Sequence, residues 1–337
     1  MTPARGSGAA PSERELIEEV LAPLARADDG SLGLTDDAAF LEHRLGRDLV
    51  ITQDTLIEGV HFRAADAPGQ VAQKSLRVNL SDLAAKGAAA RCYFLSLALP
   101  QRLDRAWIEA FAAGLRRDQE EFQVALFGGD TVRSPGPLMV SITACGDVPE
   151  GTMVRRSGAR PGERIYVSGT IGDGTLGLAV LDGGIEALDG LDGPARGQLA
   201  ERYLVPRPRL ALAPALRAHA SAAMDVSDGL VGDLGLLAGA SGVSAEIAAA
   251  AVPLSAAARQ AIARDGALLG RALTGGDDYE VLCTVARQSC AAFERAAGEA
   301  GVDVTAIGTI VEGGAAPVVR GATGEPLAFE QASYAHF

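Results

Sequence analysis

The sequence predicts an α/β (α+β) protein with two domains. The chain has 337 residues, which is more than one ordinary domain contains. Hydrophobic residues make up 48% of it, enough for a core in each half. Short apolar runs alternate with helical patterns along its length. We expect a disordered tail over 1–11, an N-terminal domain with a mixed sheet over 12–148, and a C-terminal α/β domain over 149–337.

The first half alternates helices and strands. Ser12 and Glu15 form a capping-box pattern, and apolar residues at helical spacing follow as far as about Ala25. Asp104 is placed to cap a second long helix. We expect helices over 12–25, 69–88 and 105–120, and strands over 48–52, 93–99, 123–127 and 138–145.

The second half begins after a segment rich in Gly, Pro and Arg over 147–163, which is typical of a domain boundary. The Gly- and Asp-rich segment 183–196 predicts a loop. A strand leads into Asp228, and a helix follows to about 238. We expect the other helices over 174–182, 197–204, 208–219, 254–265 and 287–299, and strands over 164–168, 222–226, 243–248, 279–284, 302–310 and 316–319.

Composition excludes several classes of protein. The net charge of −13 leaves no surplus of Lys and Arg for binding nucleic acid or an anionic membrane. No run of about 18 apolar residues could span a membrane. The four cysteines form no C-x-x-C pair and have no zinc spacing, so we expect free thiols in a reducing cytoplasm.

Two nucleotide-binding signatures can be tested directly. The chain has no G-x-x-x-x-G-K-[ST], so a P-loop is excluded. A G-x-G-x-x-G does occur at Gly172, Gly174 and Gly177, between a predicted strand and a helix. No second strand ends in an acidic residue about 20 positions later, as dinucleotide binding requires. We interpret this motif as a tight turn between strand and helix, with dinucleotide binding as the minor alternative.

Aspartates recur at strand ends and in glycine-containing loops. Crowded carboxylates are costly unless cations neutralise them, and Mg²⁺ prefers oxygen ligands that it bridges to phosphates. Each aspartate also has a plainer interpretation: Asp82 as a solvated helix residue, Asp228 as an N-cap, and Asp130 and Asp277 as turn residues. The joint pattern favours a metal and phosphate site. Its members are Asp36, Asp37, Asp54, Asp82, Asp130, Asp225, Asp228, Asp277 and Asp278.

These motifs resemble, in order and spacing, those of the thiamine-monophosphate kinase family. That family belongs to the superfamily of aminoimidazole-ribonucleotide synthetase and selenophosphate synthetase. The resemblance extends over about 12–337. It implies the synthetase-like superfamily fold, a homodimer formed through the N-terminal sheet, and transfer of a phosphoryl group from ATP to thiamine monophosphate. The motifs are GLTDDAAF, DTLIEGVHF, KSLRVNLSDLAAKGA, FGGDTVRSP, RSGARPGERIYVSGTIGD, DVSDGL and LTGGDDYE.

The resemblance also implies roles for individual residues. Metal ligands would be Asp37, Thr52, Gln53 (through its carbonyl), Asp54, Asp82, Asp130, Asp225 and Asp228. ATP would contact Gly129, Asp130, Arg156 and Ser227, and the acceptor would contact His61, Asp277 and Gln331. Catalysis would rest on Asp54, Asp82, Asp130 and Arg156. An ionised phosphate acceptor needs no general base, so positioning and charge neutralisation would supply the rate.

The chain departs from the family pattern at four positions. Gln53 replaces Thr or Ser, and Lys86 replaces Met, where it could pair with Asp82 or lie near phosphates. Gln331 stands where family members have an aromatic residue, and the nearby Phe329 could take over the role of that residue. Ala113 lies where some members have an adenine-stacking Tyr.

Two alternatives stay open: another ATP-using enzyme of the superfamily that acts on a different phosphorylated metabolite, and a catalytically silent nucleotide-binding homologue. Selenophosphate synthetase is disfavoured, because the N-terminal segment lacks a reactive Cys or Lys. A nucleotide cyclase suggested by GGDDYE does not fit the rest of the chain.

Overall fold

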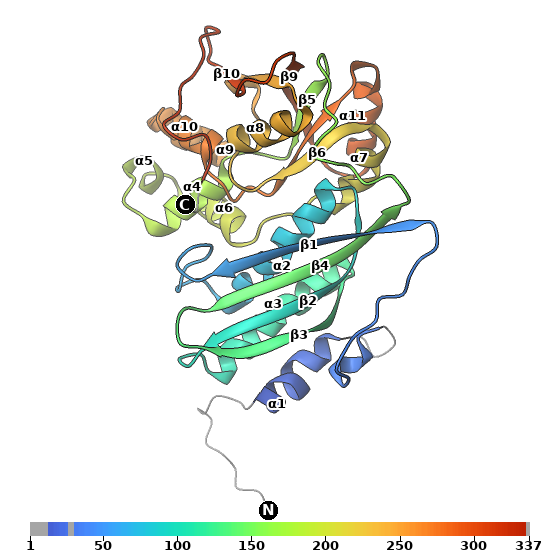
Figure 1. Cartoon of the computed structure of the whole chain (residues 1–337). Helices are drawn as coiled ribbons and strands as arrows, with labels where there is room; N and C mark the ends of the chain where they lie inside the picture. The colour runs from blue at the N-terminus through green and yellow to red at the C-terminus, as the bar shows by residue number, and fades with distance from the viewer. Residues whose placement is uncertain (1–12, 26–29, 335–337) are drawn as a thin grey trace, which may run out of the picture. The chain divides into compact units, whose positions relative to one another are not determined.

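Two units of chain, each built around its own β-sheet, make up the protein (Figure 1). The structure is a computed structural model that describes residues 13–25 and 30–334. The first unit takes in Met1–Leu83 and Ala90–Asp147, and the second takes in Ala84–Ala89 and Val148–Phe337. The predicted tail over 1–11 and Ser12 of the predicted cap lie outside the described residues.

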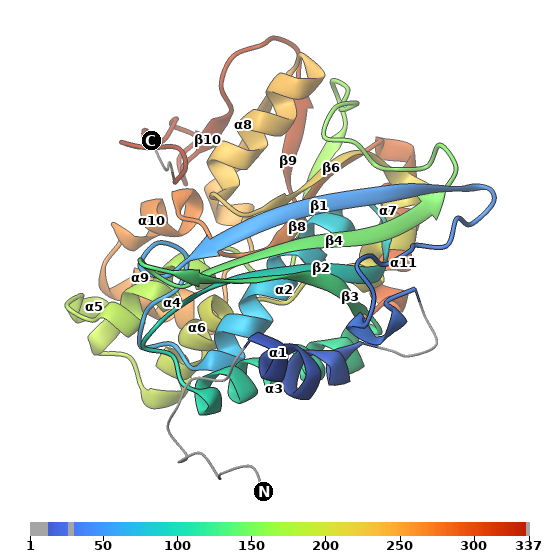
Figure 2. The same cartoon turned by 60° about the horizontal axis from the view of Figure 1, so that its bottom comes forward.

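The sheet of the first unit has four strands in the order β1-β4-β2-β3. β2 and β3 run parallel, and helix α3 (Arg105–Phe122) connects them in a β-α-β crossover. Helices α2 (Pro68–Ala85) and α3 cover one face of this sheet (Figure 2). The strands are β1 (Arg47–Ile57), β2 (Ala89–Pro100), β3 (Ala125–Ser134) and β4 (Met139–Pro149).

Local sequence explains why α3 forms where it does. The side chain of Asp104 accepts a hydrogen bond from the Trp107 N–H at 2.9 Å, so the predicted N-cap is confirmed. Ile108, Phe111 and Leu115 then recur at helical spacing, and all three are buried. The apolar stripe of α3 therefore faces the interior of the first unit.

Strand β1 has two different faces. Val50 and Leu56 are buried, whereas Leu49 and Ile51 are 50% and 58% exposed. Because side chains alternate along a strand, the even-numbered residues of β1 point toward α2 and the odd-numbered ones point away. Both helices lie on the same side of the sheet (Figure 2). Leu49 and Ile51 therefore lie on the sheet face that α2 and α3 do not cover.

The sheet of the second unit has six strands in the order β10-β7-β9-β5-β8-β6. Its pairings are antiparallel except for the parallel pair of β10 and β7. The strands are β5 (Arg164–Ser168), β6 (Ala220–Val226), β7 (Ser244–Ala248), β8 (Glu280–Val285), β9 (Val304–Val311) and β10 (Val318–Arg320).

Helices cover both faces of the second sheet. Ile165 and Val167 of β5 belong to a core that includes α8 (Leu230–Ser241), whereas Tyr166 packs edge-on against Phe293 of α11 (Cys290–Glu299). A third apolar cluster joins α4 (Asp173–Asp182), α6 (Gly193–Leu204) and α9 (Ala256–Arg264). The remaining helices are α5 (Glu186–Asp189), α7 (Ala213–His219) and α10 (Leu268–Thr274). Two mixed α/β units confirm the predicted fold class.

Several predicted elements differ from the structure. The segment 183–196 is not one loop, because it holds α5 and the start of α6, where the Asp192 side chain accepts from the Ala195 N–H at 2.8 Å. Helix α10 was not predicted at all. The first helix is not regular: α1 (Glu13–Leu16) continues into a π-helical turn over Ile17–Leu21 and a 3₁₀ turn over Ala22–Leu24.

Candidate active site

Thr52, Asp54 and Asp82 lie together between β1 and α2. The Thr52 hydroxyl donates to the Asp82 carboxylate at 2.5 Å, and the Asp54 N–H donates to the Asn79 side chain at 3.1 Å. Asp82 is only half-buried but has this defined partner, so its interpretation as a purely solvated helix residue is wrong. The even-numbered face of β1 thus presents oxygen atoms beside those of α2.

Gln53 lies on the opposite face of β1. Its side-chain amide donates to the Ser141 hydroxyl on β4 at 3.1 Å, while Thr52 and Asp54 point toward α2. The Gln53 side chain therefore cannot share a ligand set with those two residues. Only its backbone carbonyl is compatible with the predicted metal role.

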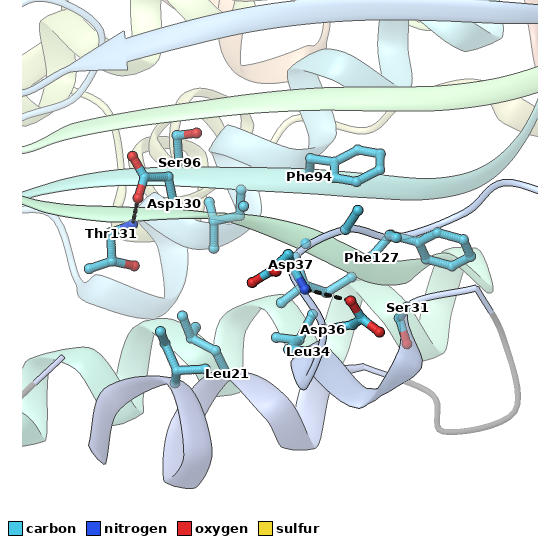
Figure 3. Close-up of a pocket in the computed structure, with 17 residues that line it drawn as sticks. Leu21, Ser31, Leu34, Asp36, Asp37, Phe94, Ser96, Phe127, Asp130 and Thr131 are labelled. Atoms are coloured by element: carbon cyan, nitrogen blue, oxygen red, sulfur yellow. Dashed lines mark hydrogen bonds between the residues drawn. The ribbon is translucent and has the colours of Figure 1, made fainter. Parts of the chain in front are cut away.

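A cavity of about 570 Å³ in the first unit brings together Asp36, Asp37, Gly129 and Asp130 (Figure 3). The Asp37 N–H donates to the Asp36 carboxylate at 2.8 Å, and the Thr131 N–H donates to Asp130 at the same distance. Asp130 and Asp37 thus line the same space, although they are distant in sequence.

Apolar side chains also line this cavity. Its labelled apolar side chains in Figure 3 are Leu21, Leu34, Phe94 and Phe127. Phe94 and Phe127 pack edge-to-face, with ring centroids 6.4 Å apart. A cavity of this size, lined by apolar side chains and a few polar groups, is typical of a small-molecule site.

The Gly-Gly-Asp motif of the first unit is part of a strand. Gly128, Gly129 and Asp130 pair with Phe94, Leu95 and Ser96 of β2, so the interpretation of Asp130 as a turn residue is wrong. A Cβ on Gly129 would lie 1.8 Å from the Leu95 carbonyl oxygen. Glycine is therefore required here by the close approach of β2.

Two loops pack together at the end of the second sheet. The Asp277 N–H donates to the Ser227 carbonyl at 2.9 Å, and the Tyr279 N–H donates to the Val226 carbonyl at 2.8 Å. A Cβ on Gly276 would lie 2.3 Å from the Ser227 carbonyl oxygen. The motifs DVSDGL and LTGGDDYE, about 50 residues apart, therefore form one surface.

Asp228 does not cap α8. The N-cap is Gly229, and the Asp233 side chain from the first turn of α8 accepts from the Asp228 N–H at 3.1 Å. Burial of Asp233 raises the pKa of its carboxyl to about 7, helped by the charge of Asp228 and opposed by backbone N–H groups. The N-cap residue of α8 is thus Gly229 and not Asp228, and Asp225 lies in β6, one residue before its last residue, Val226.

The G-x-G-x-x-G segment is a turn that the protein fills with its own carboxyl group. The Asp278 side chain, 1% exposed, accepts from the N–H groups of Gly172 at 2.7 Å and Gly174 at 3.0 Å. A Cβ on Gly177 would lie 2.0 Å from the Leu199 carbonyl oxygen of α6. The glycines serve close packing, and the N–H groups that a pyrophosphate would need are already bonded.

The remaining predicted residues lie on exposed or half-buried segments. The His61 ring accepts the Ile57 N–H through Nδ1 at 3.0 Å in the turn after β1. Arg156 and Gln331 are exposed. Phe329 is half-buried and packs against the core that contains α8. The ammonium of Lys86 donates to the Ala223 carbonyl at 2.8 Å, a contact that the sequence did not predict.

Each unit gathers its predicted residues separately. Within the described part of the chain, no three acidic, His or Cys side chains stand close enough together to hold a metal ion by themselves. The described helices also include none long and apolar enough to cross a bilayer. The sequence did not predict a role for Asp233, nor the hydrogen bonds of Asp278 to the Gly172 and Gly174 N–H groups. For Asp278, the only signal in the sequence was a second aspartate directly after Asp277.

Comparison with known proteins identifies the family. The chain matches the model of the AIR synthase related protein N-terminal domain over residues 35–148 and that of the C-terminal domain over 160–320. It is 46% identical over 310 residues to the thiamine-monophosphate kinase of Caulobacter vibrioides, covering 91% of this chain and 86% of that protein.

Solved structures agree with this. The crystal structure of thiamine-monophosphate kinase from Stenotrophomonas maltophilia is 41% identical, with a TM-score of 0.80, over 91% of this chain and 94% of that one. AaThiL, complexed with AMPPCP and TMP, is 31% identical, with a TM-score of 0.76, over 96% and 94% of the two chains. The chain belongs to the thiamine-monophosphate kinase family of AIR synthase-related proteins.

Proposed function

We propose that this protein phosphorylates thiamine monophosphate with ATP, giving thiamine diphosphate and ADP. The observation that carries the proposal is the similarity of 96% of the chain to AaThiL, a structure complexed with AMPPCP and TMP, at a TM-score of 0.76. The 46% identity to the Caulobacter vibrioides kinase supports the same reaction. In it, the bond between the γ-phosphorus and its bridging oxygen breaks, and a bond to an acceptor phosphate oxygen forms.

We assign magnesium binding to oxygen donors of both units. The donor set fits Mg²⁺, because it consists of carboxylates, a hydroxyl and a backbone carbonyl. Bound ions would neutralise the polyphosphate and polarise the transferring group. The residues are Asp37, Thr52, Gln53 through its carbonyl, Asp54, Asp82, Asp130, Asp225 and Asp228.

We assign the nucleotide site to the cavity that Asp37 and Asp130 line. Its volume of about 570 Å³ suits a small molecule, and its apolar side chains could pack against a purine base. Gly129 offers backbone beside Asp130, where the strand approaches β2 closely. By the family resemblance alone, we also assign ATP contacts to Ser227 and to Arg156, the latter through its planar guanidinium fork.

We assign acceptor binding to His61, Asp277 and Gln331. The Nδ1 atom of His61 accepts a backbone N–H, so the neutral ring carries its proton on Nε2, which can donate to a phosphate oxygen. Asp277 lies on the surface formed with Ser227. The acceptor oxygen is already ionised at neutral pH, so Asp54, Asp82, Asp130 and Arg156 act by positioning and charge rather than as a general base.

We also propose a homodimer in a reducing cytoplasm. Leu49 and Ile51 form an exposed apolar pair on the sheet face opposite α2 and α3, where a second copy could pack. All four cysteines are free thiols, as expected in a reducing compartment.

The test is a coupled assay with purified protein, ATP, Mg²⁺ and thiamine monophosphate. Equal amounts of ADP and thiamine diphosphate, lost with EDTA, are the expected result. ADP without thiamine diphosphate would assign another acceptor, and no ADP would refute the proposal.

A further inference from the structure

The loop that carries Asp277 has an unusual backbone. Asp277 has φ 73° and Tyr279 has φ 52°, although neither is glycine. Left-handed backbone is uncommon for residues with a side chain, and surrounding contacts must hold it in place. Two such residues separated only by Asp278 indicate that this short segment is fixed from outside.

Asp278 supplies the fixing contacts. Its two carboxyl oxygens accept the N–H groups of Gly172 and Gly174 at the start of α4. Its backbone carbonyl accepts from the Arg202 guanidinium at 3.2 Å. Asp278 is therefore held at its side chain by the start of α4 and at its main chain by Arg202 of α6, and both of these elements lie outside the loop.

A buried network of hydrogen bonds around Glu280 holds Arg202 in place. Arg202 also donates to the Glu280 carboxylate at 2.8 Å, and the Nε of Arg209 donates to the other Glu280 oxygen at 2.6 Å. The Ser168 hydroxyl donates to the same oxygen at 2.5 Å. Glu280 is fully buried, so these contacts are shielded from water and tie the start of β8 to β5 and α6.

Gly174 lets the loop approach α4. A Cβ at this position would lie 2.2 Å from the Asp277 carbonyl oxygen. Any side chain would therefore push the loop away from the N–H groups that hold Asp278. Gly174, the second glycine of the G-x-G-x-x-G segment, therefore helps to hold the loop in the same position as the Asp278 hydrogen bonds do.

We propose that Asp278 is a positioning residue, which clamps the Asp277 loop onto the start of α4 and thereby aims Asp277 at the phosphorylated acceptor. The role in acceptor binding rests on the proposed function, whereas the clamp itself does not. In Asp278→Asn only one oxygen remains, and an amide N–H₂ faces the second backbone N–H, so one of the two hydrogen bonds is lost.

Hydrogen exchange and steady-state kinetics test the two parts separately. In Asp278→Asn we expect exchange of the Asp277 and Tyr279 amides to rise about tenfold or more. We expect KM for thiamine monophosphate to rise about tenfold, with KM for ATP and kcat within about threefold of wild type. Gly174→Ala should show the same pattern, because it displaces the loop directly.

Two controls separate positioning from general destabilisation. Asp192→Asn makes the same substitution at another helix start, where Asp192 accepts a backbone N–H, and should change neither quantity. Phe293→Leu removes packing from the second core and should lower Tm without moving KM.

Unchanged exchange of the loop amides in Asp278→Asn and in Gly174→Ala would overturn the clamp. Raised exchange with an unchanged KM for thiamine monophosphate would overturn the role in acceptor binding. A wild type that forms no thiamine diphosphate would instead refute the proposed function, and amide exchange would then decide the clamp by itself.

Discussion

Asp54 and Asp130 test the metal assignment most directly at the scale of single residues. Asp54 lies on the same face of β1 as Thr52, with its N–H bonded to the Asn79 side chain, and Asp130 lines the same cavity as Asp37. Replacing either with Asn keeps its shape but removes a charge that Mg²⁺ requires. We expect kcat to fall about a hundredfold or more in Asp54→Asn and Asp130→Asn, with an unchanged circular dichroism spectrum. Near-normal kcat in saturating magnesium would contradict the assignment.

Asp277 tests the acceptor site. Removing its carboxylate in Asp277→Ala should raise KM for thiamine monophosphate by about tenfold and leave KM for ATP within about twofold. Alanine is also disfavoured at φ 73°, so Asp277→Asn, which tolerates this backbone, is the matched variant. Equal effects on both substrates would move Asp277 out of the acceptor site.

Asp278 gives stability a specific dependence on pH. Burial raises the pKa of its carboxyl to about 8, although the N–H groups of Gly172 and Gly174 act in the opposite direction. An unfolded aspartate titrates near about 3.9. The contribution of Asp278 to the free energy of unfolding is therefore fully present below a pH of about 4 and is lost as the pH rises through about 8.

In urea titrations, the free energy of unfolding of wild type minus that of Asp278→Asn should thus fall as the pH rises from about 5 to about 9. A difference that stays constant over this range would show that Asp278 does not titrate as its burial implies.

At the scale of elements, α3 shows how a local signal fixes a helix start. Asp104 bonds the Trp107 N–H, and Asp104→Ala should cost about 1 kcal/mol of unfolding free energy in urea titrations. Asp104→Asn keeps a side-chain oxygen at the cap, so it should lower the free energy of unfolding by only about 0.3 kcal/mol. Equal losses in the two variants would show that capping is not the cause.

The strands show where local signals are insufficient. The run 123–127 predicted a strand that stops before Gly128, because glycine and aspartate usually mark turns. In the structure β3 continues to Ser134, since pairing with β2 satisfies its backbone groups. Tertiary pairing therefore overrides the turn preference of Gly128, Gly129 and Asp130. The helices in 183–196 were missed for a related reason, because their stability comes from packing in the cluster with α9.

At the scale of the whole molecule, the uncovered sheet face of the first unit predicts self-association. Ile51→Lys places a charge where an apolar partner surface is proposed, and should shift the protein from dimer to monomer in sedimentation velocity. Leu236→Lys is the matched control, because Leu236 is 50% exposed on α8 of the second unit. A dimer that persists in Ile51→Lys would place the interface elsewhere.

The fold class, the family and most helices and strands could be predicted from the sequence, because hydrophobic periodicity, caps and ordered motifs are local properties of the chain. The sequence also singled out the aspartates, since their settings repeat. The folded structure was needed to show which of these side chains share a site: Asp37 and Asp130 line one cavity, and Asp82 bonds Thr52. It also decided that Asp278 occupies the glycine-rich turn, because that contact joins backbone and side chain about 100 residues apart and no local pattern encodes it.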